Sequence, residues 1–360
     1  MKVTQYILHA LSIPLKWPFN GVFPGQKVNP VIIRLFTEDG LESFGLAFAW
    51  NDRHVKALKE SVEGLAEGIR GQDIFRGAEA WQKLWKSSKW MGHQGYGMYA
   101  LWAIDTALWG LRAQALNQPL YRLLGGCQEE VPAYASHLLF RNWTMEELER
   151  DVGDLLCQGF QAAKMNMGGK PLKVEVERIQ RVREAAGPDF RIMVDANWSW
   201  TVAEAIRIGK AIAPYDVYWL EDPVASDDAE DLAAVKAALD IPIVAGETRS
   251  LKQGFRPLLE KGAADFIMID LQCVGGITEW IKVAALAEAW NLPVCSHLFH
   301  DFSVHLVAAV SNGGWVEYMP WWDEIYQEPP RVVNGFMKVP HLPGAGLTLD
   351  LEKIQFYEFR

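Results

Sequence analysis

A repeat of short apolar segments constrains the fold of this chain more than any other feature of its sequence. From Val131 onward, each apolar segment is followed by a stretch with the periodicity of an amphipathic helix. This alternation is typical of parallel strands joined by crossover helices. We therefore predict a (β/α) barrel, with an open doubly wound sheet as the alternative, which the lack of a Gly-rich phosphate loop after the first segment disfavours. The segments read VPAYAS, AAKMNM, FRIMVDAN, VYWLED, IPIVAGE, FIMIDL, LPVCSH and GGWVEYM.

The first third of the chain follows a different pattern, in which apolar and polar residues alternate. Three such stretches read VTQYILHALSI, PVIIRLFTEDG and ESFGLAFAW, and TEDG has the composition of a hairpin turn. Helical periodicity follows from about His54 to Gly126. We predict an α+β module over residues 1–126, the barrel over residues 127–325, and a C-terminal segment over residues 326–360 that returns to the N-terminal module.

Charge and hydropathy exclude two classes of partner. A formal net charge of −10 without any cluster of Lys and Arg argues against binding to nucleic acid. No apolar stretch is long enough to span a bilayer, and the N-terminus alternates like a strand instead of forming a signal peptide. We therefore expect a cytoplasmic, soluble protein, and its half-hydrophobic composition supplies a large core.

The cysteines of the chain are far apart and show no C-x-x-C spacing. Most of them fall inside apolar runs, which favours buried free thiols in a reducing compartment over disulfides or a zinc site. The four residues are Cys127, Cys157, Cys273 and Cys295.

Most of the apolar segments end in a polar residue, and these residues recur at intervals of 20 to 31 positions. The C-terminal ends of the strands of a barrel converge on one mouth, so side chains far apart in sequence would become neighbours there. The residues are Lys164, Asp195, Glu221, Glu247, Asp270, His297 and Glu317.

Three of these residues, Asp195, Glu221 and Glu247, follow successive segments. A single acid of this kind would be explained by a helix cap or a surface ion pair. Three carboxylates that face one point repel each other unless a cation or protons lie between them. All-oxygen ligation with room for water or substrate favours Mg²⁺, with Mn²⁺ as the alternative. We predict a divalent metal site at these three acids.

Asp270 and His297 end neighbouring segments and could form a dyad. A carboxylate bonded to one imidazole nitrogen fixes the tautomer and makes the other nitrogen a general base near neutral pH. Lys164 would have its pKa lowered by the metal or would hold a substrate carboxylate, although a lysine at a strand end can also reach out to solvent. Glu317 would donate a hydrogen bond if it were kept protonated, or would be an ordinary strand-end acid.

Taken as an ordered set, these residues resemble those of the enolase superfamily and, within it, the mandelate racemase/muconate lactonizing enzyme family, in particular its acid-sugar dehydratases. The resemblance covers nearly the whole chain. It rests on the strand-end residues named above and on the segments DTALWGLRAQALNQPLYRLLGG, KMN, VDAN, LEDP and AGE.

The resemblance implies a modified (β/α)₇β barrel under an α+β capping domain, with Mg²⁺ on the three acids. It further implies removal of the proton α to a carboxylate by a Lys or His base, a chemistry for which this superfamily is a standard example. Lys164 would lie beside the carboxylate of a small-molecule substrate, Asn197 near its α-oxygen, and Glu317 across from the metal as a hydrogen-bond donor. The protein would form a homo-oligomer, from a dimer to an octamer.

Loops of the capping domain, around Phe19 to Pro24 and Trp50 to His54, would close over the substrate in such a protein. Several aromatic residues near the mouth could contact it, although cap packing explains most of them equally well. His137 and His300 could each supply a second acid. The residues that we expect to contact substrate are Asn166, Asn197, Phe19, Asn20, Trp50, His137 and Trp321.

Asn166 departs from the racemases of the family, which have a second lysine there as the base on one face of the substrate. An amide cannot take up and return a proton, so only the face of His297 keeps a base. We therefore predict dehydration of a sugar acid, an aldonate or aldarate, to a 2-keto-3-deoxy acid, with His297 as base and acid. The alternatives are a cycloisomerase of an anhydro-sugar acid or lactone, a racemase or epimerase of a 2-hydroxy acid, and an inactive binding homologue.

Overall fold

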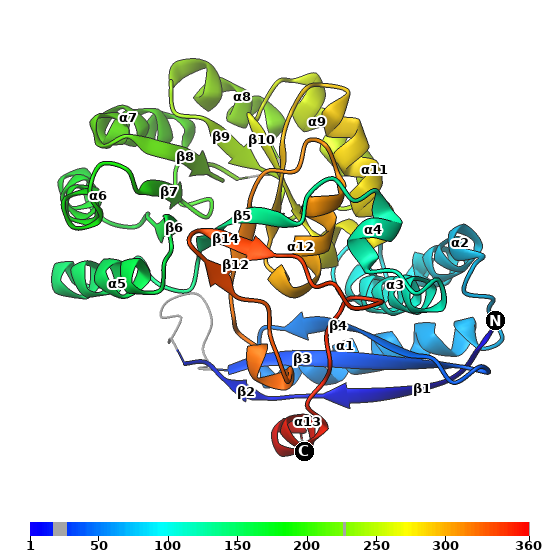
Figure 1. The fold of residues 1–360 in the computed structure, drawn as a ribbon. Coiled ribbons are helices and arrows are strands. Elements are labelled where there is room, and N and C mark those ends of the chain that lie inside the picture. Colours follow the sequence, from blue (N-terminus) through cyan, green and yellow to red (C-terminus); the bar gives the residue numbers. More distant parts are fainter. Residues whose placement is uncertain (17–26, 226–227, 360) are drawn as a thin grey trace.

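The computed structural model describes residues 1–16, 27–225 and 228–359 (Figure 1). The N-terminal strands form an antiparallel sheet in which β3 pairs with each of the other three strands. TEDG makes the predicted hairpin, since Gly40 has a φ of 84° and its N–H donates to the carbonyl of Thr37 (3.1 Å). The strands are β1 (Val3–Ala10), β2 (Ile13–Pro14), β3 (Lys27–Thr37) and β4 (Glu42–Ala49).

Helices cover one face of this sheet, as the helical periodicity predicts. Helix α1 begins after Asn51, whose side chain accepts hydrogen bonds from the backbone N–H groups of Arg53 and His54. Helix α3 passes close to β4 at Gly45, where a Cβ atom would lie 2.0 Å from the carbonyl oxygen of Ala103. A side chain at this position would therefore separate the helix from the sheet. The helices are α1 (Asp52–Ala66), α2 (Gly77–Ser87), α3 (Tyr96–Ala115) and α4 (Leu120–Leu124).

The remainder of the described chain contains the predicted barrel strands. They pair in parallel in the order β11-β10-β9-β8-β7-β6-β5, and β12 pairs with β5. The N–H of Ser296 donates to the carbonyl of Trp315 (3.0 Å), which links β11 to the segment of β12 and closes the sheet. The strands are β5 (Glu130–Ala135), β6 (Ala162–Asn166), β7 (Arg191–Asp195), β8 (Val217–Glu221), β9 (Ile243–Ala245), β10 (Phe266–Asp270), β11 (Val294–His297) and β12 (Val316–Tyr318).

Crossover helices surround these strands (Figure 1). Helices α5 and α7 begin with capping boxes, in which Thr144 and Thr201 exchange hydrogen bonds with the glutamates three residues later. The alternation of seven connecting units and a final strand is the (β/α)₇β pattern that the family resemblance implies. The helices are α5 (Met145–Cys157), α6 (Leu172–Ala186), α7 (Val202–Ile212), α8 (Ala229–Ala238), α9 (Leu251–Glu260), α10 (Leu271–Val274), α11 (Ile277–Glu288) and α12 (His300–Ala309).

A layer of buried side chains fills the barrel beneath its C-terminal mouth. Successive side chains of a strand point to opposite faces, so the residue two positions later shares the same face. Met193 therefore precedes Asp195, Met268 precedes Asp270, and the polar side chains stand above an apolar floor. The floor consists of Tyr134, Ala162, Met193, Trp219, Val244, Met268, Cys295 and Trp315.

The C-terminal segment contacts both parts of the molecule. Strand β14 (Phe336–Lys338) pairs with β13 (Val332–Val333) and with β5 of the barrel. After helix α13 (Leu351–Tyr357), the N–H of Phe359 donates to the carbonyl of Ala10 (2.7 Å) at the end of β1. The domain boundaries after residues 126 and 325 stay predictions.

The cysteines differ in part from expectation. All four are free, Cys295 is buried and Cys273 is partly buried. Cys127 and Cys157 are exposed, so the prediction of burial is wrong for these two. Cys157 is the last residue of α5 on its solvent side, and Cys127 lies in the loop that leads from α4 to β5.

Across the described ranges, no helix is both long and apolar enough to cross a membrane.

Candidate active site

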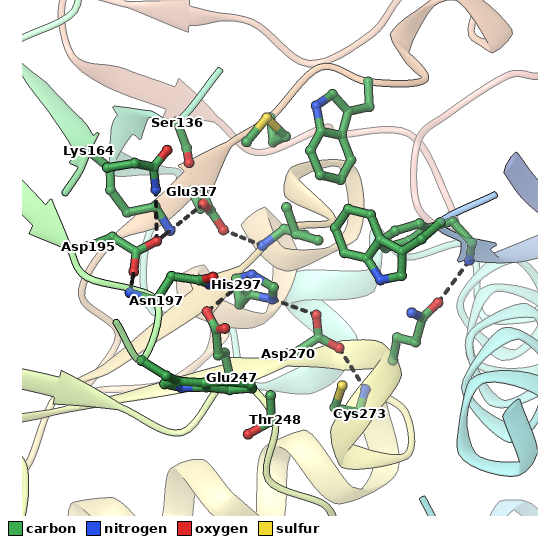
Figure 2. A pocket seen from close by; sticks show the side chains of 18 of the residues that line it. Ser136, Lys164, Asp195, Asn197, Glu247, Thr248, Asp270, Cys273, His297 and Glu317 are labelled. Atoms are coloured by element: carbon green, nitrogen blue, oxygen red, sulfur yellow. Dashed lines mark hydrogen bonds and ion pairs between the residues drawn. The ribbon is translucent and has the colours of Figure 1, made fainter. Parts of the chain in front are cut away.

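A cavity of about 370 Å³ opens at the C-terminal ends of the barrel strands, where the sequence predicts a site. Six of the seven strand-end residues line it, and Glu221 lies fully buried behind them. Figure 2 shows Lys164, Asp195 and Glu317 on one side, Asp270 and Cys273 on the other, and His297 and Glu247 between them. The fold therefore brings the predicted side chains to one place.

Lys164 forms the centre of a group of buried ion pairs. Its Nζ lies 2.8 Å from Oε1 of Glu221, 2.8 Å from Oε1 of Glu317 and 3.6 Å from Oδ2 of Asp195. Burial alone would lower the pKa of Lys164, but the charges of Glu221 and Glu317 outweigh it and hold this pKa well above its usual value. Lys164 is therefore a fixed cation in this arrangement.

Glu317 is the anionic partner of this lysine. Burial raises the pKa of Glu317, but the charges of Lys164 and His297 outweigh that effect and lower it to about 2. Its Oε2 accepts a hydrogen bond from the N–H of Leu298 (2.6 Å), which has a positive φ of 50° after β11. In this structure the buried cation next to the carboxylate favours the ionised form of Glu317, and its role as a hydrogen-bond donor to substrate stays a prediction.

Asp270 and His297 form the predicted dyad. They pair across β10 and β11, and Oδ2 of Asp270 lies 2.7 Å from Nδ1 of His297. The N–H of Cys273 donates to the other oxygen of Asp270 (2.6 Å) and fixes the carboxylate. The second ring nitrogen, Nε2, lies 3.3 Å from Oε2 of Glu247.

The charge around His297 determines its protonation. Burial lowers the pKa of His297, but the carboxylates of Glu247, Glu317 and Asp270 together raise it to about 10. His297 therefore holds a proton at neutral pH while these acids are charged. A cation that neutralised Glu247 would remove the largest of these effects and favour the basic form of His297.

The three acids predicted to bind metal differ in their surroundings. Asp195 accepts from the N–H of Asn197 (2.8 Å), and Glu221 accepts from Nε1 of Trp219 (3.2 Å). Burial and the neighbouring acids raise the pKa of Glu221 to about 8, and burial also raises the pKa of Glu247. Such a group of buried, mutually repelling carboxylates has the oxygen donors that a divalent cation prefers.

The present side-chain positions do not converge on a single point. Among the described residues, no three Asp, Glu, His or Cys side chains approach one another as closely as the ligands of one ion do. Nζ of Lys164 instead lies within 4 Å of both Asp195 and Glu221. The chemistry of the donors fits a divalent cation, and in this structure Lys164 balances their charge.

Asn166 also lines the cavity, at the end of β6. Its Nδ2 donates to Oδ2 of Asp195 (3.1 Å), and its backbone carbonyl accepts from Nη1 of Arg178 (3.3 Å). The amide thus orients a carboxylate and has no group that could accept a proton from a substrate.

Aromatic side chains form the wall of the cavity near the capping domain. The rings of Trp50 and Trp321 lie 5.4 Å apart at 77°, and Phe48 packs against both. Trp50, Trp321, Asn166 and Asn197 line the cavity, and their contact with substrate stays a prediction. Phe19 and Asn20 lie outside the described residues.

The structure places neither His137 nor His300 at the cavity wall. The ring of His137 is buried against Phe160 and Tyr318, and burial lowers its pKa to about 4. His300 is fully buried with Nε2 3.0 Å from Oδ1 of Asp323. Ser136, the preceding residue, lines the cavity in place of His137, and the predicted contact of His137 with substrate has no support from this arrangement.

Several residues of the cavity were not found by sequence reasoning. Ser136, Leu298 and Met319 offered a signal, because each directly follows a strand. The others come mainly from loops and helix starts, which have no periodic pattern; they are Phe48, Tyr99, Phe140, Arg141, Thr248, Gln272 and Cys273.

Two family models together match most of the chain. Residues 6–125 match "Mandelate racemase / muconate lactonizing enzyme, N-terminal domain", and residues 147–354 match "Enolase C-terminal domain-like". A 3,6-anhydro-alpha-L-galactonate cycloisomerase from Streptomyces coelicolor is 33% identical over 352 residues, which cover 95% of each protein.

Solved structures resemble the whole fold. A racemase from Streptomyces coelicolor A3(2) with bound magnesium superimposes with a TM-score of 0.94 at 31% identity and covers 99% of each chain. The L-talarate dehydratase from Polaromonas sp. JS666, complexed with Mg and L-glucarate, has a TM-score of 0.92 at 27% identity and covers 99% of this chain and 97% of that one. Cycloisomerase, racemase and dehydratase thus all occur among similar proteins.

Proposed function

Because the chain belongs to the mandelate racemase/muconate lactonizing enzyme family of the enolase superfamily, we propose that this enzyme dehydrates a sugar acid, an aldonate or aldarate, to a 2-keto-3-deoxy acid. The reaction depends on Mg²⁺, with Mn²⁺ as the alternative. Relatives with this chemistry, and solved relatives that contain magnesium, support the proposal.

The choice of reaction depends on one observation: the cavity contains the dyad of His297 and Asp270, and it has an amide, Asn166, where a second base would be needed. His297 ends β11 and Asn166 ends β6, with four strands between them along one side of the sheet. Racemisation by two bases needs a proton-transfer group on each face of the α-carbon, and Asn166 cannot serve as one. Elimination of water needs only one base together with an acid for the departing hydroxide.

Asp195, Glu221 and Glu247 are the residues that would hold the metal. When bound, Mg²⁺ neutralises their charge and stabilises the negative charge that develops on the substrate carboxylate. The ammonium of Lys164 would then be paired less strongly with these acids and would bind the same carboxylate. Asp195 would keep its hydrogen bonds from Asn166 and from the N–H of Asn197, which orient it.

The proton follows a path through one side chain. Nε2 of His297 removes the α-proton, while Asp270 stabilises the imidazolium at Nδ1. The same proton passes to the β-hydroxyl, the C–O bond breaks, and water leaves. The resulting enol becomes the 2-keto-3-deoxy acid. Because one group acts as base and acid, removal of the proton and hydroxyl occurs on the same face.

A cycloisomerase is the second candidate, because it too needs a single base and because a relative with this activity is 33% identical over 95% of the chain. The substrate would then be an anhydro-sugar acid or a lactone. Racemisation or epimerisation of a 2-hydroxy acid is less consistent with Asn166. An inactive binding homologue would lose parts of the acid set and of the dyad, which this chain keeps.

Incubation of the protein and Mg²⁺ with a panel of aldonates and aldarates, followed by an assay for 2-keto acid, tests the proposal. We expect product from at least one substrate and none with the His297→Asn variant. Absence of 2-keto acid across the panel, together with a racemase or lactone-opening activity, would refute it. Exchange of the α-proton in D₂O that persists in His297→Asn would identify Lys164 as the base instead.

A further inference from the structure

Arg141 is a cavity-lining cation that the proposed reaction does not use. It lies in the loop between β5 and α5 and is partly exposed. Its Nη1 donates to Oγ of Ser199 (3.2 Å), and its Nη2 lies 3.5 Å from the carbonyl of Ala196. Both acceptors are uncharged. Throughout the described ranges, no carboxylate forms an ion pair with Arg141.

The neighbouring cations have charged partners, which makes Arg141 different. Lys164 has three carboxylates within 4 Å. Arg178 is paired with Glu175 (3.1 Å). Burial lowers the pKa of Arg178, and the nearby charge of Arg141 lowers it further by a smaller amount. Arg141 therefore brings a positive charge to the cavity that no acid among residues 1–16, 27–225 and 228–359 balances by an ion pair.

The loop after β7 holds this guanidinium in place. Ser199 and Ala196 belong to one turn, in which the N–H of Ser199 donates to the carbonyl of Ala196 (3.1 Å). The turn packs against Gly168, where a Cβ atom would lie 2.5 Å from the Ser199 side chain. Two N–H groups of Arg141 are fixed by this turn. The remaining N–H groups of its planar fork have no acceptor in the part of the chain that the structure describes, so they can bind a ligand.

We propose that Arg141 determines specificity by binding a second carboxylate of the substrate, at the end remote from the reacting α-carbon, so that aldarates are preferred over aldonates. This inference rests on the proposed function and names its substrate class. Lys164 lies deep in the cavity, where it would bind the reacting carboxylate. A substrate that extends from there toward the more exposed Arg141 would bring its other end to the guanidinium.

The physical basis is the difference between a charged and a neutral end group. A carboxylate accepts two parallel hydrogen bonds from a guanidinium, and hydrogen bonds between charged groups are about twice as strong as neutral ones. The CH₂OH end of an aldonate would cover Arg141 without balancing its charge. We expect the diacid to bind at least about tenfold more tightly than the matched aldonate.

Isothermal titration in the presence of Mg²⁺ tests this assignment, with His297→Asn as the background so that no ligand is consumed. The ligands are stereochemically matched pairs, such as galactarate with galactonate and mannarate with mannonate. We expect Arg141→Met to abolish the preference for the diacid and Arg141→Lys to keep part of it. Arg207→Met, which changes an exposed arginine on α7, is the control and should keep the full preference.

The outcomes separate this inference from the proposed function. Equal binding of diacids and aldonates, or a preference that survives in Arg141→Met, overturns the role of Arg141 and leaves dehydration unaffected. Tighter binding of 6-phosphogluconate than of any diacid assigns Arg141 to a phosphate and also overturns it. A diacid preference that depends on Arg141, without formation of 2-keto acid by the wild type, supports the inference and refutes dehydration. Failure of every diacid to bind overturns the inference.

Discussion

Oδ2 of Asp270 lies 2.7 Å from Nδ1 of His297, across the paired ends of β10 and β11. This contact leaves Nε2 as the ring nitrogen that faces Glu247 and the cavity. Both oxygens of Asp270 have partners, since the other oxygen accepts from the N–H of Cys273 (2.6 Å). It acts by fixing the orientation and tautomer of the imidazole.

The Asp270→Asn variant should therefore lose turnover while it keeps substrate binding. An amide at this position can stabilise the wrong tautomer and cannot balance the imidazolium. We expect kcat to fall by roughly 10²- to 10⁴-fold, with little change in KM. Steady-state kinetics with a substrate from the panel measures both. A variant whose kcat stays near that of the wild type would show that His297 does not depend on this contact.

Replacement of Lys164 should destabilise the metal-free protein. In Lys164→Met, the buried carboxylates of Glu221 and Glu317 lose the cation that balances them. Breaking a buried ion pair by removal of one partner costs about 3–5 kcal/mol of unfolding free energy. Chemical denaturation at pH 7 in EDTA measures the loss, with the exposed Lys173→Met as control. Equal stability of the two variants would contradict the central position of Lys164.

Mg²⁺ should stabilise the wild type through the three acids. A ligand that binds only the folded state raises the melting temperature in proportion to the logarithm of its concentration. We expect Mg²⁺ to raise Tm, EDTA to reverse the rise, and the exposed control Asp189→Asn to behave like the wild type. The variants that test the ligand set are Asp195→Asn, Glu221→Gln and Glu247→Gln. If a variant keeps the Mg²⁺-dependent rise in Tm, the acid altered in it is not a ligand.

Acid should destabilise the fold in part through His305. This histidine of α12 is fully buried, its Nε2 lies 2.9 Å from the carbonyl of Ala345, and burial lowers its pKa to about 4. The unfolded chain takes up its proton near pH 6.5, so the stability contributed by His305 is complete above that pH and declines as the pH falls toward 4.

Denaturation curves of the wild type and His305→Gln between pH 7 and 4 test this linkage. The glutamine keeps a hydrogen-bond donor but cannot be protonated. The unfolding free energy of the wild type should fall more steeply below pH 6.5, by at most about 1.4 kcal/mol per pH unit. Groups common to both proteins, such as His137, cancel in this comparison. Parallel curves would show that His305 does not titrate on unfolding.

The strand-end residues could be predicted from the sequence because the rules of a parallel barrel are local. Apolar residues with a period of two fill the interior, and the next residue on the same face stands at the mouth. Met193 and Asp195, or Met268 and Asp270, show this spacing. The convergence of these side chains follows from the closure of the sheet, without knowledge of any single contact.

The remaining features depend on three-dimensional neighbours that no sequence pattern encodes. Arg141 lies in an irregular loop, and only the turn at Ser199 directs its guanidinium. Glu317 is ionised because Lys164, 153 positions earlier in the chain, lies 2.8 Å from it. His137 directly follows a residue of the cavity but packs away from it against Tyr318. In each case the sequence shows which residue is present but does not show which groups surround its side chain.

The hydrogen bond from the N–H of Phe48 to Oε1 of Gln272 (2.8 Å) joins β4 of the capping domain to the helix that follows Asp270. This hydrogen bond thus joins the aromatic wall of the cavity to the segment that carries Asp270, the residue that orients His297. Changes of substrate range in this scaffold should therefore arise through exchange of side chains such as Trp50 and Trp321, because a shift of the strand itself would also displace the dyad. For directed evolution, these two positions offer new selectivity at the lowest risk to turnover.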